Sequence, residues 1–191
     1  MPARLTLVCH AATAATRSAA FPSDEGIEPG AAELAAALAG RLRRADRAST
    51  RVWTSPALCA RQTAAALNLD ATAHSGLRDC GYGRWSGRKL ADVQAEDPAG
   101  VAAWLTDAAA APHGGEARSA LFARVAAWLR ERVAENGHIV AVTHPAVIRA
   151  AIMGAVDAPA RAFWRIDIEP LSVVELRSDG TRWNLRAAAP T

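Results

Sequence analysis

Two histidines follow two short apolar runs of this sequence. His10 comes directly after "LTLVC", and His144 directly after "IVAVT". Such short runs, rich in branched residues, are typical of strands buried on both faces of a sheet. In open sheets of this kind, ligands bind at the carboxyl ends of the strands. If the two strands are neighbours, the imidazoles meet at one edge, where one can act as a nucleophile and the other can orient a charge or a proton.

Each histidine taken alone is more simply a core residue that is hydrogen-bonded to the backbone. The pairing at two strand ends favours the functional interpretation. The remaining histidines, His74, His113 and His138, show no partner in the sequence, and we expect His138, at the start of a strand, to lie on the surface.

Strands and helices alternate along most of the chain. Strands are expected at 4–9, 50–55 and 138–144, and helices with apolar residues at helical spacing at 31–45, 55–69, 116–137 and 145–156. This alternation predicts a mostly parallel central sheet with helices on both faces, a three-layer α/β/α sandwich. Arg43 and Arg44 suit the end of the first helix. Ser55 is the expected N-cap of the second, with Pro56 at its first position.

The rest of the chain is less regular. Region 71–115 holds a short strand candidate at 71–75 and two short helices around 89–96 and 98–108. The tail predicts edge strands at 163–169, 172–178 and 181–187, the last two joined by a hairpin through Asp179 and Gly180. With 191 residues, we expect one domain over 1–191, in which 71–115 is an inserted region.

Composition narrows the classes of function. The net charge of +3 comes almost wholly from scattered arginines, without the dense basic runs and interleaved aromatics of a nucleic-acid surface. No apolar stretch approaches the ~20 residues that cross a bilayer. The N-terminal residues lack the pattern of an export signal. We therefore expect a cytoplasmic protein that binds neither nucleic acid nor membrane, with three cysteines present as thiols.

Five segments, in order, resemble the motifs of the histidine phosphatase superfamily, in its phosphoglycerate mutase-like branch. The family's Arg-His-Gly strand end corresponds to "LVCHAAT", and its Ser-Pro-Leu-x-Arg-Ala-x-Gln-Thr helix start to "TSPALCARQTA". Its third, fourth and fifth motifs correspond to "LRDCGYGRWSG", "GGEAR" and "VTHPAVIRA". The resemblance implies a phosphoglycerate mutase-like fold and hydrolysis of a phosphomonoester.

The resemblance also implies roles for single residues. His10 matches the histidine that attacks phosphorus and becomes phosphohistidine, and His144 matches the second histidine, which hydrogen-bonds the phosphoryl oxygens. Asp79 matches the carboxylate that protonates the leaving oxygen, usually a glutamate. Glu116 matches a carboxylate near the pocket mouth that could substitute as the acid. Thr16 stands where the family often has an asparagine that touches phosphate.

Two departures affect the phosphate pocket. Cys9 and Cys59 stand where the family has the two arginines that hold the phosphoryl oxygens. Each such contact contributes roughly 1.5 to 3 kcal/mol, so losing both would slow the reaction by about a hundredfold to over ten-thousandfold. A neutral thiol cannot replace these arginines. Without them the pocket loses its main attraction for a dianion, unless Arg17, Arg61 or Arg78 turns toward it.

Three functions remain open from the sequence. The first is a phosphatase of low activity that needs no cofactor and acts on a small phosphorylated molecule or anion. The second is a non-catalytic relative with a binding or regulatory role, which uses the pocket that holds phosphate in the family. The third is a Cys/His metal or redox site, because Cys9, Cys59 and Cys80 all fall in motifs that approach His10. These thiols could be inert, form a Cys9–Cys59 disulfide, or bind zinc, although their spacing matches no standard zinc motif.

Overall fold

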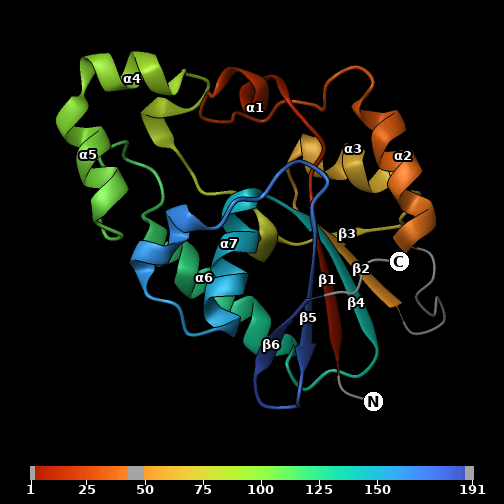
Figure 1. Cartoon of the computed structure of the whole chain (residues 1–191). Helices are drawn as coiled ribbons and strands as arrows, with labels where there is room; N and C mark the ends of the chain where they lie inside the picture. The colour runs from red at the N-terminus through yellow and green to blue at the C-terminus, as the bar shows by residue number, and fades with distance from the viewer. Residues whose placement is uncertain (1–2, 43–49, 188–191) are drawn as a thin grey trace.

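The computed structural model describes residues 3–42 and 50–187, and within them a single six-stranded sheet forms the centre (Figure 1). The strand order is β3-β2-β4-β1-β5-β6. Four strands run parallel, and β5 is antiparallel to both β1 and β6. The mostly parallel sheet that the sequence predicts is confirmed. The strands are β1 (Arg4–Cys9), β2 (Thr50–Thr54), β3 (Thr72–Ala73), β4 (His138–Thr143), β5 (Val173–Ser178) and β6 (Trp183–Arg186).

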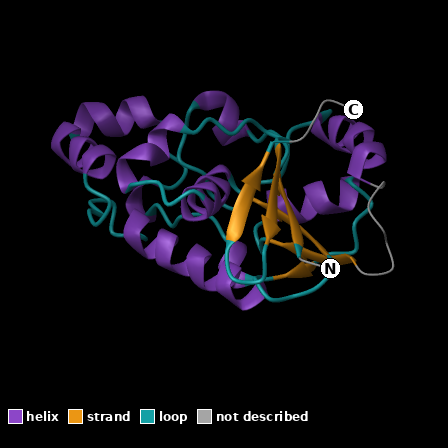
Figure 2. Ribbon diagram, turned by 60° about the horizontal axis from the view of Figure 1, so that its bottom comes forward, coloured by secondary structure: helices purple, strands orange, loops and turns teal. Residues whose placement is uncertain are grey.

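Helices cover both faces of the sheet, which makes the three-layer architecture (Figure 2). Helices α6 and α7 pack on one face, and α2 and α3 on the other. Within the described ranges, no helix has the length and apolarity needed to span a bilayer. The helices are α1 (Ala14–Ser18), α2 (Ala31–Leu42), α3 (Leu58–Ala66), α4 (Leu90–Glu96), α5 (Pro98–Thr106), α6 (Arg118–Arg132) and α7 (Pro145–Ala155), with short 3-10 helices at Ser75–Leu77, Gly83–Trp85 and Ala160–Arg165.

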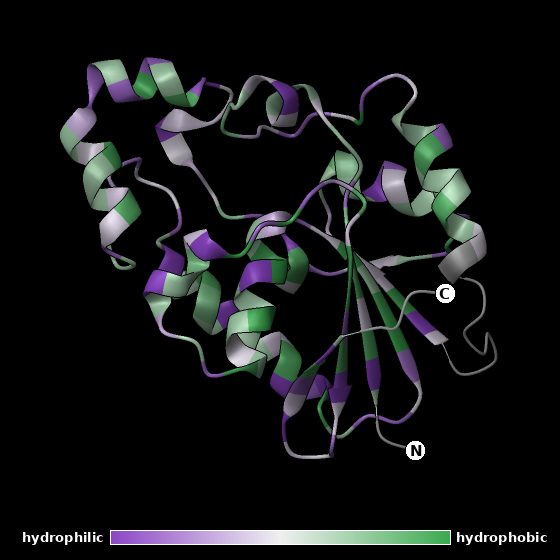
Figure 3. Cartoon of the chain, viewed as in Figure 1, coloured by the Kyte–Doolittle hydropathy of each residue, from purple (hydrophilic) through white to green (hydrophobic). Residues whose placement is uncertain are grey.

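The core is split by the sheet into two apolar layers, and the strands that carry it are coloured as apolar in Figure 3. Alternate residues of β1 serve the two layers: Leu5, Leu7 and Cys9 face α6 and α7, whereas Val8 faces α2 and α3. On α6, the predicted apolar stripe is buried at four positions, Leu121, Val125, Trp128 and Leu129. Arg43 and Arg44, expected at the end of α2, lie outside the described residues.

A third apolar cluster lies away from the sheet, where α4 and α5 stand apart at the upper left of Figure 1. Trp85 is its centre, with only 1% of its surface exposed. Its ring lies 5.1 Å from that of Phe21 and 5.9 Å from that of Trp104. Through these contacts, the loop between α1 and α2, the 3-10 helix at Gly83–Trp85 and α5 become one packed unit.

Ser55 does not cap α3, contrary to the sequence prediction. The helix begins at Leu58, and its N-cap residue Ala57 makes no side-chain cap. Ser55 is completely buried, and its Oγ is hydrogen-bonded to Nε2 of His144 at 2.7 Å. The hydroxyl also accepts the N–H of Ala57 at 3.2 Å, so it joins the residue before α3 to a buried imidazole at the end of β4.

The tail corrects two further expectations. Residues 163–169 form no strand: a 3-10 helix spans Ala160–Arg165, and the carbonyl of Ile166 accepts a hydrogen bond from Nε of Arg149. The hairpin of β5 and β6 is confirmed, but only β6 is an edge strand, because β5 pairs with β1. A side chain from α7 therefore holds the segment that a strand partner was expected to hold.

His138 is buried, contrary to the surface position expected for it. It is 9% exposed, and its Nε2 lies 2.8 Å from Oγ1 of Thr6. β4 runs between β1 and β2, so even its first residue is covered.

Truncation of Trp85 tests the aromatic cluster. Trp85→Ala should lower the free energy of unfolding by about 3 to 5 kcal/mol, because it leaves a cavity among rings that cannot collapse fully. Urea unfolding followed by circular dichroism measures the change. Leu34→Ala, at a position 66% exposed on α2, is the control and should leave stability nearly unchanged.

Candidate active site

The register between β1 and β4 brings the two predicted histidines together. Cys9 and Thr143 are paired across the two parallel strands, and the backbone N–H of His10 donates to the carbonyl of Thr143 at 2.8 Å. His10 and His144 follow directly, so their ring centroids lie 5.1 Å apart, edge to face. Both are buried, with 7% and 3% of their surfaces exposed.

His10 has one nitrogen held and one left available. Its Nδ1 donates to the carbonyl of Ala11 at 2.8 Å, because a carbonyl oxygen can only accept. In the neutral ring, Nε2 then carries the lone pair. Burial lowers the pKa of His10, and the neighbouring His144 lowers it further. The arrangement suits a nucleophilic nitrogen near neutral pH.

His144 is held from the opposite side. Its Nε2 is hydrogen-bonded to Ser55, whereas its Nδ1 has no hydrogen-bond partner and lies 3.7 Å from Oδ2 of Asp79. Burial, with a smaller effect from Arg124, lowers the pKa of His144 to about 3. This imidazole is therefore neutral, with Nδ1 turned toward Asp79.

Asp79 supplies a carboxyl that can exchange a proton. Burial raises its pKa to about 6, although the N–H of Cys80, which donates to its Oδ1 at 2.8 Å, acts in the opposite direction. A carboxyl with this pKa is well suited to general acid catalysis near neutral pH.

Arg124 of α6 positions the segment that carries Asp79. Its guanidinium donates to the carbonyls of Gly76, Arg78 and Asp79 over 2.9 to 3.3 Å. It also donates to Glu116 at 2.7 Å. One partly buried arginine thus holds three backbone carbonyls of the segment that leads to Asp79.

Glu116 has a structural set of partners and does not line the cavity at the two histidines. Arg78 donates to both of its oxygens, at 2.8 and 3.0 Å, and Arg124 donates to both as well. Burial opposes the charge, but these hydrogen bonds hold the pKa of Glu116 below its ordinary value. It is therefore ionised and fully occupied, which leaves Asp79 as the available acid.

A cavity of about 690 Å³ opens at the two histidines. Aromatic rings form one part of its wall, contributed by Phe21, Tyr82, Trp104, Phe163 and Trp164. Such a volume is typical of sites for small organic ligands.

The charged groups in this wall are mostly acidic. Among the described residues that line it, three are carboxylates, Asp24, Glu25 and Asp79, and one is an arginine, Arg149. Oδ1 of Asp24 accepts the N–H of Leu58 at 2.8 Å, at the first turn of α3. A helix N-terminus that would suit a phosphate already faces a carboxylate of the protein.

The histidine phosphatase superfamily (branch 1) model matches residues 5–190. The chain belongs to this superfamily. Mycobacterial glucosyl-3-phosphoglycerate phosphatase, in complex with VO3, is 26% identical, with 96% of each chain covered and a TM-score of 0.83. A protein described as mycobacterial hydrolase 1 is 25% identical over 96% of each chain, with a TM-score of 0.84.

A mutant phosphoserine phosphatase from Entamoeba histolytica, in complex with phosphoserine, shares the fold. The TM-score is 0.82 and the identity 18%, over 97% of this chain and 95% of that one. No curated protein sequence matches the chain significantly. The family resemblance and the fold that the sequence indicated are thereby confirmed.

The cysteines of this histidine phosphatase relative occupy three different surroundings, and all three are free thiols. Cys9 is completely buried in the layer under α6 and α7 and does not line the cavity. Cys59 and Cys80 do line it. Cys80 donates to the carbonyl of Glu116 at 3.2 Å. Burial, together with Asp79, raises the pKa of each thiol to about 12, so all three are neutral.

The other residues expected to bind phosphate are mostly turned elsewhere. Thr16 lines the cavity on α1. Arg17 is exposed and paired with Glu28 at 2.9 Å. Arg61 is exposed on α3 and does not line the cavity. Neither arginine takes the position of a lost one.

The sequence did not predict a role in the site for several residues. Ser55 follows a strand that neighbours β4, so its place at the same sheet edge was a usable signal. Asp24 and Glu25 lie in the loop between α1 and α2, and both line the cavity. Arg124 and Arg149 gave no local signal, because the backbone carbonyls that they hold lie 17 to 48 residues away in the chain.

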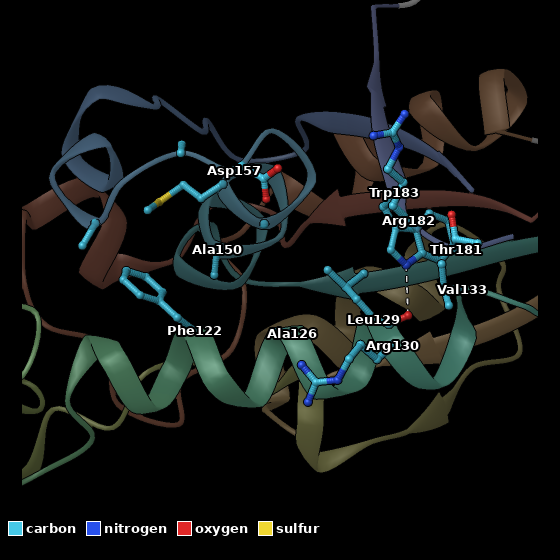
Figure 4. A pocket seen from close by; sticks show the side chains of 14 residues that line it. Phe122, Ala126, Leu129, Arg130, Val133, Ala150, Asp157, Thr181, Arg182 and Trp183 are labelled. Atoms are coloured by element: carbon cyan, nitrogen blue, oxygen red, sulfur yellow. Dashed lines mark hydrogen bonds between the residues drawn. The ribbon is translucent and has the colours of Figure 1, made fainter. Parts of the chain in front are cut away.

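A second cavity, of about 510 Å³, lies between α6, α7 and the β5–β6 hairpin (Figure 4). Apolar side chains such as Phe122, Leu129 and Met153 line it, and Trp183 closes one end by donating to the carbonyl of Leu129 at 2.9 Å. No histidine or cysteine is among its lining residues. The histidines that match the family motifs, His10 and His144, line the first cavity instead.

The low pKa of His144 predicts a loss of stability in acid. The unfolded chain binds a proton on this residue below about pH 6.5, whereas the folded chain resists it down to about pH 3. The contribution of His144 to the free energy of unfolding is complete above about pH 6.5 and is lost as the pH falls toward about pH 3. Between about pH 7 and about pH 4.5, His144→Gln should lose less free energy of unfolding than the unmodified protein. Equal losses in urea titrations would contradict this.

Proposed function

We propose that the chain is a phosphomonoester hydrolase of low activity that transfers the phosphoryl group to Nε2 of His10. The observation that carries the proposal is the pairing of that available nitrogen with the proton-exchanging carboxyl of Asp79 in one cavity. Membership of the superfamily and the phosphatases among the similar structures support it.

The reaction has two steps. In the first, Nε2 of His10 attacks phosphorus, the bond to the leaving oxygen breaks, and protonated Asp79 gives that oxygen its proton. In the second, a water molecule attacks the phosphohistidine while ionised Asp79 takes a proton from it, which releases phosphate and restores His10. His144 at the opposite side of the phosphoryl group donates from Nδ1 when Ser55 donates to its Nε2.

Charge limits the rate in this proposal. A phosphomonoester dianion enters a cavity whose wall holds three carboxylates and one arginine. The Nε of Arg149 is already used by the carbonyl of Ile166, so only the remaining guanidinium nitrogens can reach an anion. The largest usual contribution to phosphoryl transfer, fixed positive charge around the oxygens, is therefore weak.

The aromatic wall favours a phosphate ester of a ring-bearing alcohol. Trp104 and Trp164 line the same cavity as His10, and their rings meet edge to face with centroids 4.7 Å apart. The similar mycobacterial enzyme is named for glucosyl-3-phosphoglycerate, a phosphate ester whose glucosyl group also presents a ring. We place the protein in the cytoplasm, because three buried free thiols suit a reducing compartment. We also expect one domain that binds no nucleic acid, because the basic residues are scattered along the sequence.

Restoring arginine at the cavity should raise activity. Cys59→Arg adds one charge-assisted phosphate contact and should increase kcat/KM for p-nitrophenyl phosphate by about tenfold to about a hundredfold. Position 9 is buried in the core and does not line the cavity, so Cys9→Arg should add no such contact and the test uses Cys59→Arg alone.

His10→Ala is the control and should abolish turnover in both backgrounds. If kcat/KM of the unmodified protein equals or exceeds that of correctly folded Cys59→Arg, the loss of arginine does not limit the activity, and this part of the proposal is wrong.

The pKa of Asp79 predicts the direction of the pH dependence. The acid must be protonated for the first step, so kcat should fall as the pH rises through about 6. Asp79→Asn cannot give a proton and should lower kcat while removing this fall. Steady-state rates for phenyl phosphate, whose more basic leaving oxygen needs the proton, measure it between about pH 5 and about pH 8. A fall that persists in Asp79→Asn would assign it to another group.

A further inference from the structure

We propose that His10, Cys59 and His144 form a zinc-binding site inside the cavity. One donor atom from each residue, two imidazole nitrogens and a thiol sulfur, lies within 4.8 Å of the other two. All three residues are buried. Two nitrogens and one sulfur are a donor set that zinc prefers. The inference goes beyond the proposed phosphatase function and does not need it.

The two imidazoles already have the orientation of metal ligands. In metal sites, the ring nitrogen that does not bind the ion is usually held by a backbone carbonyl or a polar side chain. The carbonyl of Ala11 holds Nδ1 of His10, and Ser55 holds Nε2 of His144. Nε2 of His10 and Nδ1 of His144 are the nitrogens left over. The latter is an unpaired polar atom on a side chain that is only 3% exposed.

The third donor comes from a rigid part of the fold. Cys59 lies in the first turn of α3 and is 6% exposed. Its carbonyl accepts from Thr63, whose hydroxyl oxygen also accepts the N–H of Ala11, next to His10. This chain of hydrogen bonds fixes α3 against the end of β1. The sulfur of Cys59 is therefore held near the imidazole of His10 by the backbone of both elements.

The distances require only a small closure. Zinc–nitrogen and zinc–sulfur bonds of about 2.1 and 2.3 Å place neighbouring donors of a tetrahedral site about 3.5 Å apart. The donor atoms lie within 4.8 Å of one another, so no pair must close by more than about 1.3 Å. Cys9 and Cys80 are not part of the cluster, which limits the ligand set to one of the three thiols.

The charge of the wall suits a cation better than a phosphate. Asp24, Glu25 and Asp79 outnumber Arg149, and an oxygen of Glu25 is buried without a hydrogen-bond partner. A divalent cation together with an ionised Cys59 offsets much of this negative charge, whereas a phosphate dianion adds to it. The replacement of arginine by cysteine at position 59 both removes a phosphate contact and supplies a zinc ligand.

Three protein ligands leave one tetrahedral position open, as in catalytic zinc sites. Asp79 lies 3.7 Å from His144 and does not belong to the cluster, so it is placed to hydrogen-bond a group at that position. Zinc and the phosphoryl group compete in this arrangement, because both need Nε2 of His10. Bound zinc therefore inhibits the phosphatase reaction.

Zinc binding is measured by titration of chelator-treated protein against a chromophoric competitor. The unmodified protein should bind one zinc ion, and Cys59→Ser should bind it about a hundredfold more weakly or worse, which exceeds the usual effect of losing a supporting residue. His144→Gln should weaken it similarly. Cys80→Ser is the matched control, because it removes another buried thiol of the same cavity, and it should leave the affinity unchanged.

Cobalt substitution identifies the ligand directly. Co²⁺ bound by a thiolate gives a charge-transfer absorption, which the unmodified protein and Cys80→Ser should show and Cys59→Ser should lack. Circular dichroism establishes that each variant is folded. Absence of stoichiometric zinc binding, or equal losses in Cys59→Ser and Cys80→Ser, would overturn the inference.

The outcomes separate this inference from the proposed function. Turnover of p-nitrophenyl phosphate by chelator-treated protein tests the phosphatase alone, and zinc affinity tests the site alone. If the protein both hydrolyses the phosphate ester and binds zinc, zinc should inhibit turnover at the concentration at which it binds. Full activity of protein with zinc bound at the site would overturn the placement of the ion on His10.

Discussion

The hydrogen-bonded register between β1 and β4 sets where both imidazoles lie, because each histidine follows the last paired residue of its strand. A shift of the pairing would move His10 along the edge and separate it from His144. The surrounding contacts depend on this placement. Ser55 reaches His144 from the end of β2, and the loop of Asp79 is tied to β4 because Thr143 donates to the carbonyl of Leu77 at 2.7 Å.

The sequence alone predicts most of this framework. Short apolar runs rich in branched residues predict buried strands, and the helices between them indicate parallel pairing. The placement of His10 and His144 at one edge of the sheet could therefore be predicted without any contact information. Ser55 was misassigned because Ser-Pro before a helix is a strong capping signal. Burial next to an imidazole prevailed over this local preference. The segment at 163–169 has strand-like residues, but a hydrogen bond from Arg149 fixes its backbone instead.

The chemistry of the pocket was harder to predict, since it depends on which side chains face one space. The two cysteines were equivalent in the family motifs, yet the alternation of β1 turns Cys9 into the core, and the first turn of α3 leaves Cys59 in the cavity wall. Likewise, Glu116 was a plausible acid until Arg78 and Arg124 were found on both its oxygens. Such assignments require the distances between elements that are remote in the chain.

The carboxylate of Asp24 at the start of α3 acts as a tethered ligand of the pocket. Because it is attached through a short loop, its effective concentration near that helix end is of millimolar order or higher. A free anion must exceed this local concentration, or move the loop, before it can use the N–H of Leu58. The protein thus carries its own competitor for anions, and the low phosphatase activity that we propose has a cause in the chain's connectivity as well as in the cysteines at positions 9 and 59.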